Sequence, residues 1–186
     1  MSRFSFRETP LDGLVVVLPQ TLTDSRGGLT RLFCADELSS MGWTKPIAQI
    51  NRTRTEKSGT VRGFHFQAPP SAEAKLISCF KGAVWDVAVD LRADSPTFLQ
   101  WHAVELTEDN GEILLVPEGF AHGFQTLVDD CRLLYLHSAA YDAACESGVD
   151  VRDPALRVDW PLPISNLSDR DANHPALTPD FRGISL

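Results

Sequence analysis

The chain has 186 residues, of which 43% are hydrophobic and 23% are charged, a composition typical of one soluble globular domain. Its net charge of −8 argues against a nucleic-acid-binding surface, although an acidic protein can still hold a small basic pocket for an anionic ligand. The longest apolar run near the N-terminus, residues 14–18, is too short for a signal peptide or a membrane span. We therefore expect a cytoplasmic protein with no membrane or nucleic-acid partner.

Short strand-like segments separated by turn residues dominate the chain. In order, they are residues 14–19, 29–34, 62–67, 74–80, 83–91, 100–106, 111–117, 123–128 and 131–137. Turn sequences rich in glycine, proline and aspartate, such as DSRGG and EDNG, lie between them. Strands that recur about every ten residues are typical of a sandwich or barrel. The sequence therefore predicts a single all-β domain spanning residues 1–186.

Helical patterning is scarce and is visible only near residues 35–42. Residues 8–13 are expected to form an extended lead-in. The tail from Asp150 to Asp171 is rich in proline and has no clear period, so we expect it to cross the surface and pack through Trp160 and Leu162. Free thiols are predicted for the four cysteines, because their spacing matches no zinc motif. They are Cys34, Cys79, Cys131 and Cys145.

The segment RGFHFQ, residues 62–67, places an imidazole inside a predicted strand. Strand alternation puts Arg62, Phe64 and Phe66 on one face and Gly63, His65 and Gln67 on the other. The aromatic face should pack between sheets, and the opposite face should line either solvent or a barrel interior. Read alone, His65 is either a hydrogen-bonded structural histidine or a catalytic one.

Three further residues bring polar chemistry into the predicted strands. Lys75 begins a strand on the same face as apolar residues, so it is either a surface lysine or a desolvated ammonium. Tyr135 is either a core residue or a proton donor. His122 ends the sequence PEGFAH, which resembles the second half of the cupin signature. Cupins are jelly-roll barrels with an interior site.

A metal-dependent cupin enzyme, such as a dioxygenase or an isomerase, is one alternative. Metal cupins usually carry a His-x-His pair followed by a glutamate, and the corresponding residues would be His65, Gln67, Glu73 and His122. The amide of Gln67 is a poor transition-metal ligand compared with an imidazole. We therefore expect no metal and no other cofactor.

Five segments together resemble the dTDP-4-dehydrorhamnose 3,5-epimerases. They are residues 24–33, 60–98, 116–127, 135–142 and 159–171. The resemblance runs in order from about residue 13 to about residue 175. It implies an all-β, cupin-type jelly-roll β-barrel with a few short helices, which forms a homodimer. It also implies metal-independent epimerisation of a nucleotide-diphospho-4-keto-6-deoxy sugar.

The resemblance further implies a role for each site residue. His65 would be the base that removes a proton next to the 4-keto group, and Asp171 would orient it. Lys75 would stabilise the enolate, and Tyr135 would return a proton from the opposite face. The implied substrate-binding residues are His122 and Tyr141 for the sugar, Arg26 and Arg62 for the diphosphate, and Gln49 and Asn51 for the nucleotide.

The reaction itself calls for these residue types. Proton loss beside a ketone places charge on the ketone oxygen, and one donor to that oxygen is worth roughly 10²–10³ in rate. A base whose pKa lies near the working pH adds roughly 10²–10⁴, and a carboxylate on the second ring nitrogen fixes the tautomer of a histidine. Read alone, however, Arg26 could be an ordinary turn residue and Asp171 a solvated residue of the tail.

Besides Phe64, which stands where leucine is common, three positions depart from the residue types usual in the family. Leu29 and Arg31 stand where an aromatic and an acidic residue are usual, and Glu73 stands where glutamine is common. These changes fall near the expected nucleotide or sugar. A different nucleotide, and epimerisation at C3 only or at C5 only, are therefore alternatives. A non-catalytic sugar-nucleotide binder is a further one.

Overall fold

The computed structural model describes residues 2–186 and is almost entirely β-structure. Its strands are β1 (Phe4–Glu8), β2 (Val15–Pro19), β3 (Thr21–Asp24), β4 (Gly27–Thr30), β5 (Gln49–Thr55), β6 (Val61–Gln67), β7 (Lys75–Lys81), β8 (Ala83–Asp90), β9 (Trp101–Thr107), β10 (Ile113–Val116), β11 (Phe120–Thr126), β12 (Cys131–His137) and β13 (Glu146–Gly148). Its helices are α1 (Ala35–Ser39) and α2 (Asp169–Ala172). The predicted all-β class with a few short helices is confirmed.

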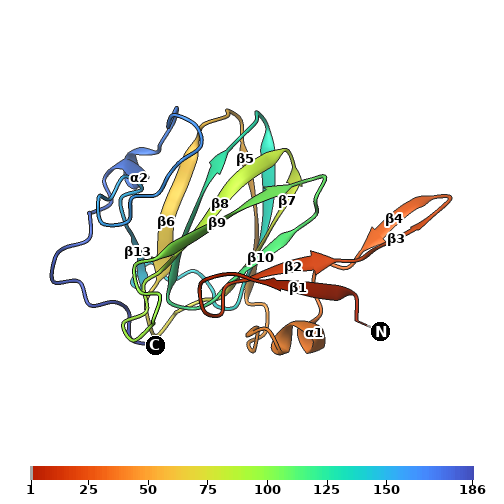
Figure 1. The fold of residues 1–186 in the computed structure, drawn as a ribbon, viewed down its shortest axis with the longest axis horizontal. Coiled ribbons are helices and arrows are strands. Elements are labelled where there is room, and N and C mark those ends of the chain that lie inside the picture. Colours follow the sequence, from red (N-terminus) through yellow and green to blue (C-terminus); the bar gives the residue numbers. More distant parts are fainter. Residues whose placement is uncertain (1) are drawn as a thin grey trace.

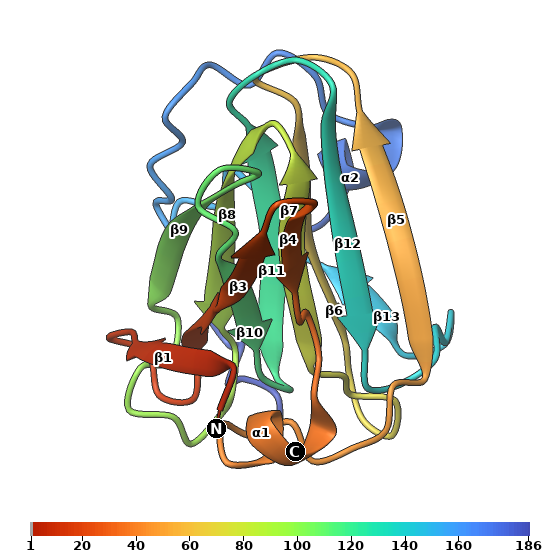
Figure 2. The same ribbon diagram turned by 90° about the vertical axis from the view of Figure 1, so that its right-hand side faces the viewer.

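Two antiparallel sheets form the cupin-type jelly-roll barrel (Figures 1 and 2). The larger sheet has six strands in the order β1-β2-β10-β7-β12-β5. The second sheet has five strands in the order β13-β6-β11-β8-β9. Neighbouring strands in space come from distant parts of the chain, as when β12 lies between β7 and β5. This topology brings residues from the middle and the end of the sequence to one site.

The main apolar core lies between the two sheets. Alternation along β8 sends Val84 and Ala88 into this core, whereas Val87 faces the opposite side. Ile77 of β7 meets them from the six-stranded sheet. Full burial of one such side chain contributes about 1.5–3 kcal/mol. Asp86, between Val84 and Ala88 on the same inner face, is fully buried and places a carboxylate beside this core.

The C-terminal segment covers the outer side of the five-stranded sheet, as Figure 1 shows in blue. The ring of Trp160 stacks on Phe64 with centroids 5.7 Å apart, which confirms the packing predicted for Trp160. Leu162 contributes through its backbone, whose N–H donates to the side chain of Gln125 at 2.9 Å. The aromatic face of β6 therefore packs beneath this segment. The sequence had predicted that this face would pack between the sheets, and that prediction is wrong. The His65 face borders the barrel interior.

Some predicted elements differ from the structure in extent. The segment 29–34 was expected to be a strand, but β4 ends at Thr30 because the chain there leaves the β3–β4 hairpin. Strand β5 was not predicted, since it lies at the edge of its sheet and most of its side chains are exposed and polar. Residues 4–8 form β1, ahead of the expected lead-in, whereas α1 and the turn at DSRGG match their predictions.

All four cysteines are free thiols, as predicted. Cys79 and Cys131 are buried in the main core. Burial raises the pKa of the Cys79 thiol to about 12, which makes it a poor nucleophile. Between residues 2 and 186, no helix combines the length and the apolar character that crossing a membrane requires.

Candidate active site

A cavity of about 330 Å³ opens between the two sheets. Strands β5, β7 and β12 line it from the six-stranded sheet, and β6 and β11 line it from the other. Every residue predicted for the site except Arg26 borders this cavity. These are His65, Lys75, Tyr135 and Asp171, together with Gln49, Asn51, Arg62, His122 and Tyr141.

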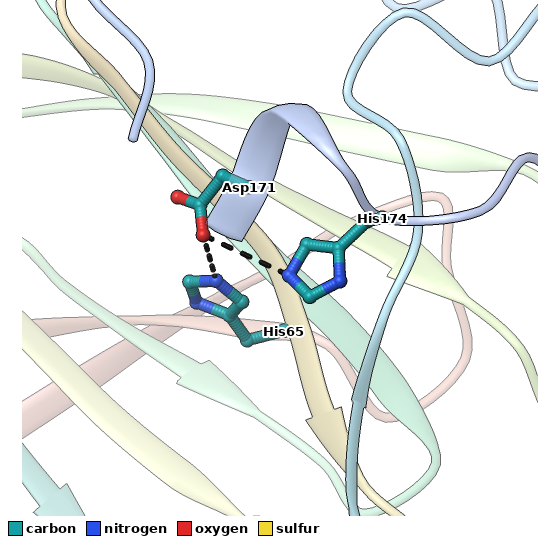
Figure 3. A group of neighbouring side chains, drawn as sticks. All are labelled: His65, Asp171 and His174. Carbon is teal, nitrogen blue, oxygen red and sulfur yellow. Dashed lines mark hydrogen bonds and ion pairs between the residues drawn. The ribbon is translucent and has the colours of Figure 1, made fainter. Parts of the chain in front are cut away.

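His65 and Asp171 form a hydrogen-bonded dyad at the cavity wall (Figure 3). The Nε2–H of His65 donates to Oδ1 of Asp171 at 2.8 Å, and the backbone N–H of Gly63 donates to Oδ2 at 3.1 Å. Ser168 caps α2 by accepting the N–H of Asp171, which fixes the carboxylate on the first turn. Asp171 is buried and not solvated. Its Oδ1 fixes the His65 tautomer and leaves Nδ1 as the basic nitrogen.

The Asp171 carboxylate stays ionised although it is buried. Burial alone would raise its pKa, but the hydrogen bond and charge of His65 and the N–H of Gly63 together hold the pKa below its usual value. An ionised carboxylate behind an imidazole stabilises the imidazolium that forms when His65 accepts a proton. The dyad is therefore suited to general-base chemistry.

Lys75 lies at the base of the cavity and is only 6% exposed. Its Nζ donates to the backbone oxygen of His65 at 3.2 Å and pairs with Oε1 of Glu73 at 3.3 Å. The surface-lysine interpretation is therefore wrong. A buried ammonium next to His65 is a strong electrostatic partner for charge that develops on a substrate oxygen.

Tyr135 borders the cavity from β12, on the sheet opposite to His65. Burial, together with the charge of Asp86, raises its pKa well above the usual value, so the phenol stays protonated at neutral pH. His122 packs edge-on against the Tyr135 ring and donates its Nε2–H to Asp86 at 2.8 Å. The cavity therefore has a base on one wall and a neutral acid on the other.

The mouth of the cavity holds the remaining polar groups. The side-chain oxygen of Gln49 accepts the backbone N–H of Tyr141 at 3.0 Å, and the Tyr141 hydroxyl donates to Glu146 at 2.9 Å. Tyr141 is 56% exposed, so its ring is available to a ligand. Asn51 lies beside His137 on the neighbouring strand, with 3.4 Å between their side-chain nitrogens.

The family model described as dTDP-4-dehydrorhamnose 3,5-epimerase matches residues 8–179. This chain belongs to the dTDP-4-dehydrorhamnose 3,5-epimerase family. The family, the fold and the isomerase class predicted from the sequence are confirmed.

Solved and curated members of the epimerase family resemble the chain over most of its length. The dTDP-4-dehydrorhamnose 3,5-epimerase of Bacillus anthracis, solved with TDP and PPi bound, is 41% identical, with a TM-score of 0.90 over 94% of this chain and 99% of that chain. A Legionella pneumophila dTDP-6-deoxy-D-glucose-3,5-epimerase, solved with dTDP-4-keto-L-rhamnose, is 35% identical, with a TM-score of 0.87 over 93% and 92%. A dTDP-4-dehydrorhamnose 3-epimerase of Streptomyces niveus is 37% identical over 89% of this chain and 80% of its own length.

Arg62 lines the same cavity as His65. Strand alternation had predicted that the two side chains lie on opposite faces of β6. The pairing of β11 with β6 places His122 opposite His65 but Phe124 opposite Arg62, so the register shifts between these two pairs. The extra residue in β6 is a β-bulge, which turns Arg62 to the same side as His65. Its guanidinium donates to Thr55 Oγ1 at 3.1 Å and remains exposed toward the cavity.

Among the predicted site residues, Arg26 alone lies away from the cavity. It occupies the tip of the β3–β4 hairpin, which projects from the body of the molecule (Figure 1). Its exposed guanidinium pairs with Asp24 at 2.7 Å. Within one copy of the chain, Arg26 is an ordinary hairpin residue.

Glu73 and His137 are site residues whose roles the sequence did not reveal. Glu73 Oε2 accepts the Nδ1–H of His137 at 2.8 Å while its other oxygen pairs with Lys75. The His137 ring stacks on Tyr135, with 6.0 Å between centroids and an interplanar angle of 19°. His137 lies two residues after Tyr135 in one strand, and this same-face spacing was the available signal.

The four residues that could have formed a cupin metal site border one cavity, but their polar atoms are bonded to other partners. The amide of Gln67 donates to the backbone oxygens of Ser71 and Ala140, while His122 pairs with Asp86. Glu73 is occupied by Lys75 and His137. In the part of the chain that the structure describes, the one group of three metal-binding side chains within 4.8 Å is His65, Asp171 and His174.

Proposed function

We propose that this chain catalyses the 3,5-epimerisation of a dTDP-linked 4-keto-6-deoxy sugar, dTDP-4-dehydro-6-deoxyglucose. One observation carries the proposal: His65 and Tyr135 border a single cavity from opposite sheets, and the Lys75 ammonium lies in the same cavity, bonded to the backbone of His65. Inversion at a carbon requires proton removal from one face and proton return to the other. A binding protein without activity would need no such pair.

His65 acts as the base in this reaction. Its Nδ1 takes the proton from the carbon next to the ketone, while the Nε2–H stays on the Asp171 carboxylate. The ion pair that results, imidazolium with carboxylate, is partly shielded from water. A positioned base of this kind supplies roughly 10²–10⁴ in rate.

Lys75 stabilises the enolate oxygen that forms when the proton leaves. Its bonds to the His65 backbone and to Glu73 hold the ammonium close to the base. Because the ammonium is already oriented in a buried site, little reorganisation accompanies charge development.

Tyr135 returns a proton to the opposite face of the planar enolate. Its pKa, raised by burial, keeps the phenol protonated until the carbanion accepts its proton. His65 then loses its added proton to solvent and the Tyr135 phenolate takes a proton from solvent, so that the same removal and return at the carbon on the other side of the ketone gives the second inversion.

The nucleotide diphosphate occupies the mouth of the cavity. Arg62 supplies a guanidinium for the diphosphate, and Tyr141 supplies an exposed aromatic ring for the sugar. Gln49, Asn51 and His122 complete the contacts with the substrate. The ligands of the Bacillus and Legionella relatives support a thymidine nucleotide.

We infer that the active protein is a homodimer in which Arg26 serves the cavity of the second copy. The hairpin carries Arg26 away from its own cavity and exposes Leu29, which is 71% exposed, and Leu22. Apolar side chains on a projecting hairpin favour burial against another protein surface. Arg26 would then reach the diphosphate that Arg62 of the other copy binds.

The proposal is tested by NMR in D₂O with the dTDP, CDP and GDP forms of 4-dehydro-6-deoxyglucose. We expect deuterium at both C3 and C5 of the dTDP sugar. Deuterium at C3 alone would reduce the assignment to a 3-epimerase. No exchange with any of the three sugars would contradict the proposal.

A further inference from the structure

His174 lies against the His65–Asp171 dyad, yet the epimerase reaction above gives it no role. Its Nε2 is 3.7 Å from Oδ1 of Asp171, and its ring is 5.4 Å from the ring of His65 at an interplanar angle of 72°. Figure 3 shows both imidazoles approaching the same carboxylate oxygen. No residue from 2 to 186 hydrogen-bonds to His174 Nε2, and this atom is shielded from solvent. A buried polar atom without a hydrogen-bond partner is destabilising, and a bound ligand at this position would remove that cost.

The backbone holds the His174 ring in its position beside the dyad. Gly148 of β13 pairs with His65 of β6, and a Cβ at Gly148 would lie 2.5 Å from atoms of the His174 ring. The ring therefore fills the space that a side chain would otherwise take. The N–H of Gly63 occupies Oδ2 of Asp171, which leaves Oδ1 to face both imidazoles.

The three side chains offer a suitable set of ligand atoms for a transition metal. Two imidazole nitrogens and one carboxylate oxygen lie within 4.8 Å of one another. Nitrogen and oxygen ligands of this kind suit Zn²⁺ and Co²⁺, which bind imidazole at about 2.0–2.1 Å. The His65 side chain is 31% exposed toward the cavity, so an ion has a way in and room for a water ligand. We propose that His65, Asp171 and His174 form an inhibitory site for a divalent transition-metal ion.

Inhibition follows from the tautomer of His65. In the free protein Nε2 carries the hydrogen and Nδ1 carries the lone pair that accepts the substrate proton. A metal ion on Nε2 needs the lone pair there, so the ring hydrogen moves to Nδ1. The nitrogen that faced the substrate as an acceptor becomes a donor, and the base is lost without any change in the fold.

The test uses tag-free, full-length protein that has been treated with a chelator and then titrated with Co²⁺. Binding is followed by the visible absorption of protein-bound cobalt, and activity is followed in parallel. We expect one ion per chain, loss of activity as the site fills, and recovery with EDTA. His174→Gln should bind at least about tenfold more weakly and resist inhibition. His102→Gln, on β9 and outside the cavity, is the matched control and should behave as wild type.

Cobalt binding to wild-type protein and to His174→Gln with equal affinity would overturn the site. Crystals of the wild-type protein soaked in Co²⁺ give a second test, which does not depend on the folding of any variant. An anomalous peak among the three side chains supports the site, and a map without that peak contradicts it. Only the inhibition rests on the proposed function, so cobalt binding to a protein that shows no epimerase activity would count against that function and not against the site.

Discussion

Nε2 of His65 lies 2.8 Å from Oδ1 of Asp171, although 106 positions separate the two residues in the sequence. One residue belongs to a central part of the five-stranded sheet and the other to a short helix near the C-terminus. The contact forms because the C-terminal segment returns to the start of β6, where Asn166 bridges to Thr60, and α2 follows directly and brings Asp171 to the cavity wall. The proposed base therefore depends on correct docking of the last thirty or so residues.

Asp171→Asn should remove the charge behind His65 while it keeps the shape of the side chain and an acceptor for Gly63. We expect kcat to fall by roughly 10²-fold or more, with little change in KM, because the imidazolium loses its stabilising partner. Asp169→Asn, in the same helix but exposed, is the control and should retain wild-type kinetics. Equal kcat values for the two variants would remove Asp171 from the mechanism.

Mixed dimers test whether Arg26 acts across a subunit interface. Arg26→Ala and His65→Asn proteins should each have very low activity, but a mixture of the two should regain activity after subunits exchange. Only one cavity of the mixed dimer combines an intact His65 with an intact Arg26, so recovery should approach about a quarter of the wild-type rate. A mixture that stays inactive although mass spectrometry shows mixed dimers would place Arg26 outside the neighbouring site.

Glu73→Gln should destabilise the protein at neutral pH. The carboxylate balances the Lys75 ammonium in a buried site, and the amide would accept the His137 bond but leave that ammonium without its counter-charge. We expect a loss of about 1–3 kcal/mol in the free energy of unfolding. The exposed Glu56→Gln variant, whose carboxylate pairs only with a surface arginine, should lose far less. Chemical denaturation of both variants makes the comparison.

The stability difference between wild type and Glu73→Gln should depend on pH. Burial alone would raise the pKa of Glu73, but the His137 hydrogen bond and the Lys75 charge hold it below its usual value. A carboxylate with a lowered folded pKa contributes its full stability above the unfolded pKa of about 4.3, and loses it as pH falls through the folded pKa. The difference should therefore be constant near neutrality and shrink below about pH 4.3. A difference that grows on acidification would contradict the ion pair.

The sequence predicted those parts of the site that depend on local pattern. Alternation put His65 on the face of β6 opposite to Phe64, toward either solvent or the barrel interior, and it put Lys75 on the same face of β7 as Ile77. The structure shows that both of these faces are the inner ones. Alternation failed for Arg62 because a β-bulge adds one residue to β6, and the local signal for it was Gly63, a glycine inside a strand whose φ is +131°. The Asp171 contact came from family resemblance, since no local rule connects residues so distant in sequence.

Residues whose roles arise from partners on other strands were harder to predict. Glu73 looked like a departure from the family near the substrate, but its function as a link between Lys75 and His137 appears only when β7 and β12 pair. His174 was not identified, because its position depends on the space left by Gly148 on another strand. Strand β5 carries Gln49 and Asn51 but lacks apolar alternation, since only its last residue is buried.

Tyr135→Phe tests the central claim, that base and acid act on opposite faces of one carbon, most directly. Without the phenol, the enolate should still form. His65 should exchange its added proton with D₂O and then return deuterium to the same face of the enolate from which it took the proton. In D₂O, NMR should therefore show deuterium entering the substrate with unchanged configuration, while formation of the epimer falls by roughly 10²-fold or more. Epimer formation by the folded variant at the wild-type rate would contradict the account.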